Sequence, residues 1–170
     1  MSIEVVIIGD THITALEKLP LEMLRAIKKA DWVIHVGDYT SKSLLDRLIE
    51  LKGQHFKGVY GNTDPQSVRD CVPDKDIFEI NGKRIGITHP KVGGSHRSTV
   101  RRVLAEFRKD KVDAILYGHT HDPKIENRNN ILLVNPGKGY LEENYYGTST
   151  TIAVLRIDDE IQAKIIKIQK

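Results

Sequence analysis

VVIIGDTH, residues 5–12, places four β-branched apolar residues directly before Gly9 and a polar segment that contains Asp10 and His12. A run that is apolar throughout, rather than alternating, predicts a strand buried on both faces, as in a parallel sheet. Because glycine has no Cβ, the backbone can turn sharply at Gly9 and direct the next side chain over the edge of the sheet. Two residues of metal-ligand type therefore lie just beyond a buried strand.

The same arrangement returns along the chain: residues 32–36 end before Gly37-Asp38, residues 55–60 before Gly61-Asn62-Thr63-Asp64, and residues 113–117 before Gly118-His119-Thr120-His121. Two segments with helical spacing separate the first three runs. One follows Pro20, and the other begins at Ser41 and runs to about residue 51, with Gly53 as its stop. This alternation predicts a parallel sheet with right-handed crossovers, whose carboxyl strand ends form the ligand site.

The second half of the chain is richer in hairpin signals. Asn81-Gly82 between the apolar runs 76–80 and 83–88 predicts a tight hairpin, and His89 follows its second strand. A glycine-containing loop then leads to a predicted helix over residues 98–108. The remainder is expected to be antiparallel, with strands near 124–127, 131–134, 150–157 and 161–168.

Length and composition exclude several classes. The 170 residues predict a single domain, 1–170, and 26 basic against 23 acidic residues give a net charge of +3 without a basic block. A long nucleic-acid partner is therefore not expected. A membrane is not expected either, since the ~20-residue apolar run of a membrane helix is missing. Cys71 is the single cysteine, and no signal peptide is evident, so a cytoplasmic location is expected.

Side chains of metal-ligand type gather at the predicted strand ends: Asp10, His12, Asp38, Asn62, His89, His119 and His121. Such a mixed set exceeds one tetrahedral site and suits two ions about 3.5–4 Å apart that share a carboxylate. Imidazole, carboxylate and amide ligands favour Mn²⁺, Fe²⁺, Zn²⁺ or Ni²⁺, with no thiolate set to select zinc alone. Two such ions promote in-line displacement at phosphorus.

Each element alone has a simpler explanation. An aspartate after a glycine, such as Asp10 or Asp38, is commonly a helix cap, and Asn62 after Gly61 fits a turn. The pair His119 and His121 would point to one side of an extended segment, which alone is weak evidence for a metal. The metal-site hypothesis therefore depends on the whole set and its order.

The series GD-x-H, GD, GN-x-D, a lone histidine and GH-x-H resembles the calcineurin-like metallophosphoesterase superfamily, in particular its small YfcE-type phosphodiesterase branch. The retromer subunit Vps29 shares the fold of that branch. The resemblance covers essentially the whole chain and implies a four-layer α/β/β/α sandwich, with two mixed sheets flanked by helices. It also implies two metal sites, with Asp10, His12 and His121 at the first, Asn62, His89 and His119 at the second, and Asp38 bridging both beside a hydroxide nucleophile.

Asp38, Asn62 and His89 are the residues expected to act in catalysis. The sequence departs from the family at Thr63, where many members have a histidine that assists the leaving group, and at Pro90, where glycine is common. A threonine hydroxyl is not a general acid near neutral pH, so a slow enzyme or a good leaving group is expected. His96 is considered as a partial replacement, although a solvated loop histidine is the commoner explanation.

Other polar residues receive secondary roles. His35, inside a predicted strand, is interpreted as packed or at an interface rather than ligating, and Asp64 as orienting a ligand. A basic set could line a phosphate-binding rim, although a solvated helix face is commoner. The set is Lys91, Arg97, Arg101 and Arg102.

The leading hypothesis is a dinuclear metal-dependent phosphodiesterase that hydrolyses small phosphodiesters. One alternative is a non-catalytic metal-binding scaffold of the retromer-subunit type, and another is a nucleotide-directed phosphatase or nuclease. A homo-oligomer is left open, because Trp32, Tyr145 and Tyr146 could belong to an interface or to the core.

Overall fold

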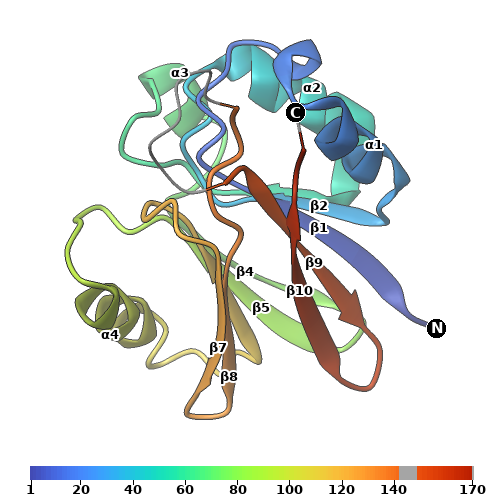
Figure 1. Cartoon of the computed structure of the whole chain (residues 1–170). Helices are drawn as coiled ribbons and strands as arrows, with labels where there is room; N and C mark the ends of the chain where they lie inside the picture. The colour runs from blue at the N-terminus through green and yellow to red at the C-terminus, as the bar shows by residue number, and fades with distance from the viewer. Residues whose placement is uncertain (142–148, 170) are drawn as a thin grey trace.

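The computed structural model describes residues 1–141 and 149–169, and its strands form two five-stranded sheets (Figure 1). The first sheet has the order β10-β9-β1-β2-β3, with β1 (Ile3–Ile8), β2 (Trp32–His35), β3 (Phe56–Gly58), β9 (Thr151–Ile157) and β10 (Ile161–Lys167). The second has the order β4-β5-β6-β8-β7, with β4 (Lys75–Ile80), β5 (Lys83–Thr88), β6 (Ala114–Tyr117), β7 (Lys124–Arg128) and β8 (Ile131–Asn135).

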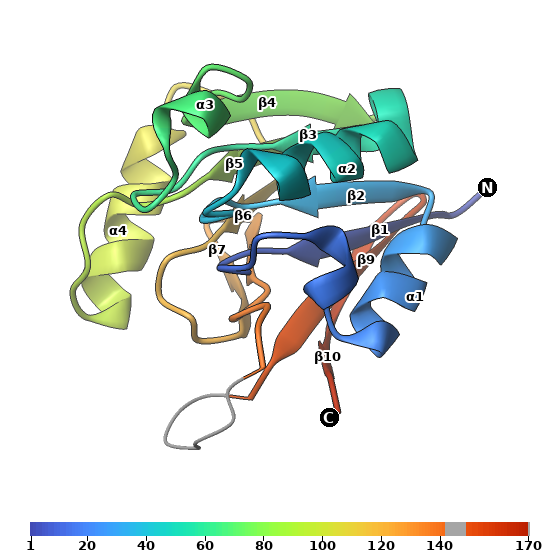
Figure 2. The same cartoon turned by 90° about the horizontal axis from the view of Figure 1, so that it is seen from above.

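Helices cover the outer face of each sheet (Figures 1 and 2). The first sheet carries α1 (Leu21–Lys29), α2 (Lys42–Lys52) and α3 (Gln66–Arg69), with short 3-10 turns at Leu16–Lys18 and Gly53–His55; the second carries α4 (His96–Glu106). One apolar cluster packs the sheets together, and two others pack the helices onto them. The predicted four-layer sandwich of two mixed sheets is confirmed.

The parallel part of the first sheet follows from its apolar strands. Ile7 of β1 lies opposite Ile34 of β2, and Val33 of β2 lies opposite Phe56 of β3, both in parallel register. All four side chains are buried, as expected for strands covered on both faces. The prediction of a strand–helix–strand crossover is confirmed here.

The prediction that the remainder is antiparallel is wrong for β8. Hairpin partners β7 and β8 are antiparallel, but β8 inserts beside β6 in parallel, with Ile115 opposite Leu133. The reason is the burial of the two hairpin strands. The sequence of β8 is apolar and its last three residues are buried, whereas polar β7 is mostly exposed and occupies the edge.

Helix ends follow local signals, with one shift. Ser41 Oγ accepts the Ser43 N–H at the start of α2, and Gly53 ends that helix at φ +56°. The last helix begins earlier than predicted, at His96 rather than residue 98, because Ser95 Oγ accepts the Ser98 N–H and caps it. It also ends two residues earlier, at Glu106.

Trp32 contributes to the packing between the sheets. Its ring lies parallel to that of Phe78, with centroids 6.4 Å apart, and it packs against the cluster between the sheets. Tyr145 and Tyr146 lie outside the described residues. Every described helix is too short or too polar to cross a lipid bilayer.

Candidate metal centre

All seven predicted ligands come together at the carboxyl ends of β1, β2, β3, β5 and β6. Figure 2 shows the loops after β1 and β2 leaving from the same end of the sheet. Contacts of 3.0–3.7 Å join the set: His121–Asp10, Asp10–His119 through the His119 backbone N–H, His119–Asn62, Asn62–His89, His89–Asp38 and Asp38–His12. Residues that are far apart in the sequence therefore form one continuous cluster.

Asp10, His12 and His121 form the first part of the cluster. One ligand atom from each lies within 4.8 Å of the others. Asp10 is fully buried, and its Oδ1 lies 3.3 Å from His121 Nε2. This contact raises the pKa of His121, and burial opposes the rise.

Asn62, His89 and His119 form the second part. His89 Nδ1 donates to the Val36 carbonyl at 2.8 Å, so a neutral ring directs its Nε2 lone pair towards Asn62 Oδ1, 3.0 Å away. His119 Nδ1 lies 3.0 Å from the same Asn62 oxygen. Burial lowers the pKa of His119, and repulsion from His89 in its protonated form lowers it further, which favours the neutral His119 ring that a cation requires.

Asp38 lies between the two parts. Its Oδ2 is 3.5 Å from His89 Nε2 and 3.7 Å from His12 Nε2, while its Oδ1 accepts the Thr63 N–H at 3.0 Å. Oxygens of Asp10 and Asp38 also lie within 4.8 Å of a His89 nitrogen. Asp38 therefore occupies the position of a carboxylate that two ions could share.

The cluster fits divalent cations. Asp10 Oδ1 faces His121 Nε2 at 3.3 Å and His12 Nε2 faces Asp38 Oδ2 at 3.7 Å, and neither buried atom forms a hydrogen bond of good geometry with the described residues. Such atoms are costly unless something satisfies them. The lone pairs of His89 Nε2, Asn62 Oδ1 and Asp38 Oδ2 also converge, and a cation between them would relieve their mutual repulsion. Imidazole, carboxylate and amide together match Mn²⁺, Fe²⁺, Zn²⁺ or Ni²⁺.

Backbone strain is concentrated in these ligands. Five of them have positive φ: Asp10 (47°), His12 (47°), Asp38 (61°), His119 (82°) and His121 (59°). Non-glycine residues rarely adopt this region, and clusters of such residues occur at functional sites.

The prediction that glycines make the sharp turns after the apolar strands is wrong for three of the four glycines. Of the glycines that end the four apolar runs, Gly37 alone has positive φ, at +102°. Gly61 is needed instead for close approach, because a Cβ there would lie 2.0 Å from Asp38 Oδ1.

Asp64 holds two of the loops together, in the positioning role predicted for it. Its Oδ2 accepts the N–H groups of Asp38 at 2.9 Å and Gly61 at 2.8 Å, and its Oδ1 accepts that of Thr40 at 2.7 Å. Burial raises the pKa of Asp64, while the hydrogen bonds from Gly61 and Thr40 oppose the rise. The Asp64 carboxylate thus fixes the backbone of Asp38 and Thr40 in the loop after β2, and that of Gly61 directly before Asn62.

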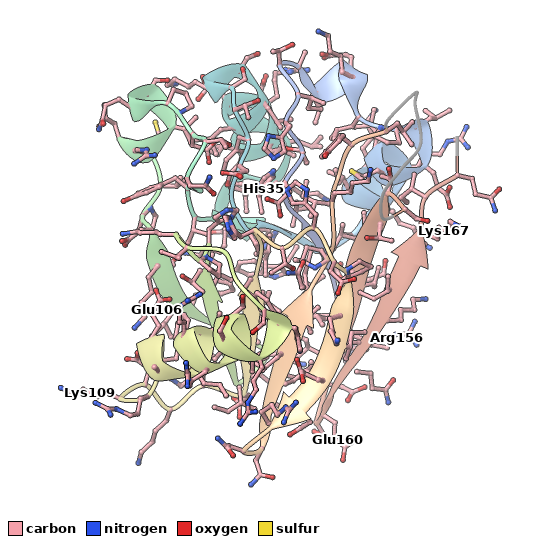
Figure 3. The ribbon with its side chains drawn as sticks, turned by 60° about the vertical axis from the view of Figure 1, so that its left-hand side comes forward. His35, Glu106, Lys109, Arg156, Glu160 and Lys167 are labelled. Atoms are coloured by element: carbon pink, nitrogen blue, oxygen red, sulfur yellow. The ribbon has the colours of Figure 1, made fainter. Side chains whose placement is uncertain are left out.

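His35 lies inside the molecule (Figure 3) and forms hydrogen bonds with the loops that follow β1 and β2. Gly37 N–H donates to its Nδ1 at 3.1 Å, so Nε2 bears the proton of the neutral ring and donates to Thr11 Oγ1 at 3.0 Å. The ring stacks on Tyr39, with centroids 3.7 Å apart, and is fully buried. His35 is packed inside the molecule, one of the two roles predicted for it.

Burial lowers the pKa of His35 well below its usual value, with smaller contributions from His89 and His12. Below about pH 6.5 the unfolded chain therefore binds a proton that the folded chain does not bind, and acid destabilises the fold. We expect this residue to reduce the free energy of unfolding by about 1.4 kcal/mol per pH unit below that point. Urea unfolding of metal-free protein between pH 7 and pH 5 measures how steeply the free energy of unfolding falls with pH. This dependence should be weaker in His35→Gln than in wild type, and unchanged in the exposed control His55→Gln. Equal slopes in wild type and His35→Gln would contradict the assignment.

The suggested additional acid, His96, has another partner. Its Nε2 lies 2.7 Å from Glu126 Oε1, which joins the start of α4 to β7. Arg102, considered for a phosphate rim, donates from Nη1 to the carbonyls of Val92 at 3.2 Å and Gly93 at 3.0 Å. Arg102 therefore holds the loop after Pro90.

Arg69 is a residue that sequence reasoning missed. Its Nε donates to the Asp64 carbonyl at 2.8 Å, and its Nη2 to the Asn62 carbonyl at 3.1 Å. It lies on α3, a four-residue helix without a periodic signal, so the sequence offers no pattern that would single it out.

Comparison with known proteins agrees with this geometry. A profile of the calcineurin-like phosphoesterase superfamily domain matches residues 3–160. The chain is 34% identical over 167 residues to probable metallophosphoesterase MJ0623 of Methanocaldococcus jannaschii, covering 96% of this chain and 81% of that protein. It is 28% identical over 153 residues to phosphodiesterase MJ0936 of the same organism, covering 79% and 84%. Zinc-bound Vps29 of Entamoeba histolytica shares the fold, with a TM-score of 0.70 at 18% identity, covering 98% of this chain and 99% of that one.

Proposed function

Because the chain belongs to the calcineurin-like phosphoesterase superfamily, we propose that it is a cytoplasmic phosphodiesterase that hydrolyses small phosphodiesters at a two-metal centre. The main support is the position of Asp38, whose Oδ2 lies 3.5 Å from His89 Nε2 and 3.7 Å from His12 Nε2. Two cations that share a ligand require a carboxylate placed between their two sets of ligands.

In this proposal, the residues of the centre bind the metal ions and orient the substrate. When bound, two divalent cations supply a hydroxide nucleophile near neutral pH and compensate charge on the attacking and leaving oxygens. Asp10 and Asp38 contribute the carboxylates, and the remaining proposed ligands are neutral in their ligating form. With two dications bound, the centre would therefore keep an excess of positive charge, which would attract a phosphodiester anion.

The leaving group receives little help from proton transfer. Thr63 provides its backbone N–H to Asp38 Oδ1 rather than an acidic side chain, and His96 is paired with Glu126. General acid catalysis typically contributes about 10²–10⁴-fold, so we expect esters of acidic alcohols to react faster than alkyl esters. Aryl diesters are accordingly suitable test substrates.

Metal-stripped protein is expected to be inactive towards bis(p-nitrophenyl) phosphate and to gain about 10²-fold or more on addition of Mn²⁺, Ni²⁺ or Zn²⁺. The release of p-nitrophenol measures the rate, and p-nitrophenyl phosphate, a monoester, is expected to react more slowly. Equal rates with and without metal would contradict the proposal.

The second candidate is a non-catalytic metal-binding scaffold of the retromer-subunit type, which the likeness in fold to Vps29 favours. The same experiment separates the two candidates. Two ions bound per chain without turnover of either ester by any metal form would favour the scaffold, whereas metal-dependent turnover favours the enzyme.

A further inference from the structure

A cavity of about 190 Å³ lies directly beside the second part of the metal centre. Its lining consists of two proposed ligands, two cations, an aromatic ring and a glycine: Asn62, His89, Arg69, Lys91, Tyr60 and Gly61. The proposed ligands Asp10, His12 and His121 are not among its lining residues. The cavity therefore extends from the Asn62–His89 side of the centre, beyond the place where Asp38 lies between the two parts.

Arg69 is fixed in this cavity by the backbone of the Asn62 loop. Its Nε and Nη2 donate to the Asp64 and Asn62 carbonyls, and its guanidinium carbon lies 5.0 Å from the centroid of the Tyr60 ring. Within residues 1–141 and 149–169, no hydrogen bond is formed by Arg69 Nη1. A guanidinium whose orientation is already set loses little conformational freedom when it binds an anion.

Lys91 supplies a second, more mobile cation. Its Nζ lies 3.1 Å from Asp74 Oδ2, and the two side chains are 67% and 50% exposed. Exposed pairs of this kind contribute little net stability, so Lys91 can exchange Asp74 for another anion at small cost. Asp74 is the acidic partner that a bound anion would have to displace.

We propose that this cavity binds a second anionic group of the substrate, a phosphate or a carboxylate beyond the reacting phosphorus. The inference rests on the proposed function, because the reacting phosphate occupies the metal centre and the second anion lies between Arg69 and Lys91. The preferred substrates are then phosphodiesters with a further negative charge on the side that faces Asn62 and His89. Charge-assisted hydrogen bonds to guanidinium and ammonium groups are the interactions that select such a group.

Non-hydrolysable ligands test the cavity separately from turnover. Calorimetry on Mn²⁺-loaded protein compares phenylphosphonate with 3- and 4-carboxyphenylphosphonate, which add one carboxylate at two distances. We expect at least one carboxylate ligand to bind about tenfold more tightly than phenylphosphonate. Equal affinity of all three ligands, or no binding of any of them, would overturn the proposal.

Two substitutions should move this preference in opposite directions. Lys91→Gln is expected to lower the affinity ratio to about twofold or less, and Asp74→Asn to raise it above the wild-type value, because the competing carboxylate is removed. Lys164→Gln, at an exposed position of β10, is the matched control and should leave the ratio unchanged. A purely structural role of Lys91 and Asp74 would not give opposite effects.

The remaining outcomes are also decisive. If Lys91→Gln weakens phenylphosphonate and the carboxylate ligands equally, Lys91 contacts the reacting group and the separate subsite is wrong. A clear carboxylate preference in a protein that hydrolyses no ester would support the cavity while contradicting the phosphodiesterase. Turnover of bis(p-nitrophenyl) phosphate without any preference for the carboxylate ligands would support the phosphodiesterase and contradict the anion-binding cavity.

Discussion

Replacement of Asp38 by asparagine is expected to lower the metal-dependent turnover of bis(p-nitrophenyl) phosphate by about 10³-fold or more. Metal ions contribute several kcal/mol to such reactions, and each ~1.4 kcal/mol corresponds to a factor of ten in rate. Asparagine keeps an oxygen that can accept the Thr63 N–H, which Asp38 Oδ1 accepts at 3.0 Å. It removes the negative charge that we propose two cations share.

Metal content provides the second measurement on this variant. After dialysis against metal-free buffer, elemental analysis should find about two ions per wild-type chain and about one per Asp38→Asn chain. The exposed Asp46→Asn, whose partner Lys42 lies 2.7 Å away, is the control and should keep both metal content and turnover. Undiminished turnover in Asp38→Asn would overturn the bridging role.

Much of the fold could be predicted because its signals are local. The apolar runs before Gly9 and Gly37 predict strands buried on both faces, and Asn81-Gly82 predicts a hairpin at its observed position. The face-to-face packing of two sheets came from the family resemblance alone, because no local pattern encodes which sheet covers which. The insertion of β8 between β6 and β7 was likewise beyond local signals, since it depends on the relative burial of three strands.

The proposed ligands could be selected from the sequence because they follow directly on predicted strands, where the topology brings them to one edge. Their supporting residues could not all be found in this way. His35 and Arg69 act through contacts with loops that are distant in sequence or irregular in structure, and neither has a motif. The positive φ of the ligands was also missed, because glycine is the residue that sequence analysis associates with such turns.

Asp64→Asn is expected to lower the free energy of unfolding by about 3 kcal/mol, the largest loss of stability among the substitutions proposed for this protein. The substitution breaks a charged hydrogen-bond network and leaves a buried donor without an acceptor, and both changes are costly. The carboxylate accepts three backbone N–H groups and is 4% exposed. Asparagine offers one oxygen, so its NH₂ group must face at least one backbone N–H. Burial raises the pKa of Asp64 and offsets part of the benefit of its charge, which keeps the expected loss below the sum of three charged hydrogen bonds.

Urea unfolding of the metal-free protein measures this loss, and thermal unfolding should show a fall in Tm of about 6–12 °C. Because Asp64 fixes the N–H groups of Asp38 and Gly61, the same variant should bind Mn²⁺ about 10–100-fold more weakly, as expected when a residue that orients metal ligands is changed. The exposed control Asp46→Asn should lose less than about 0.5 kcal/mol. A variant that is destabilised but binds Mn²⁺ with wild-type affinity would assign Asp64 to the fold alone and remove it from the metal centre.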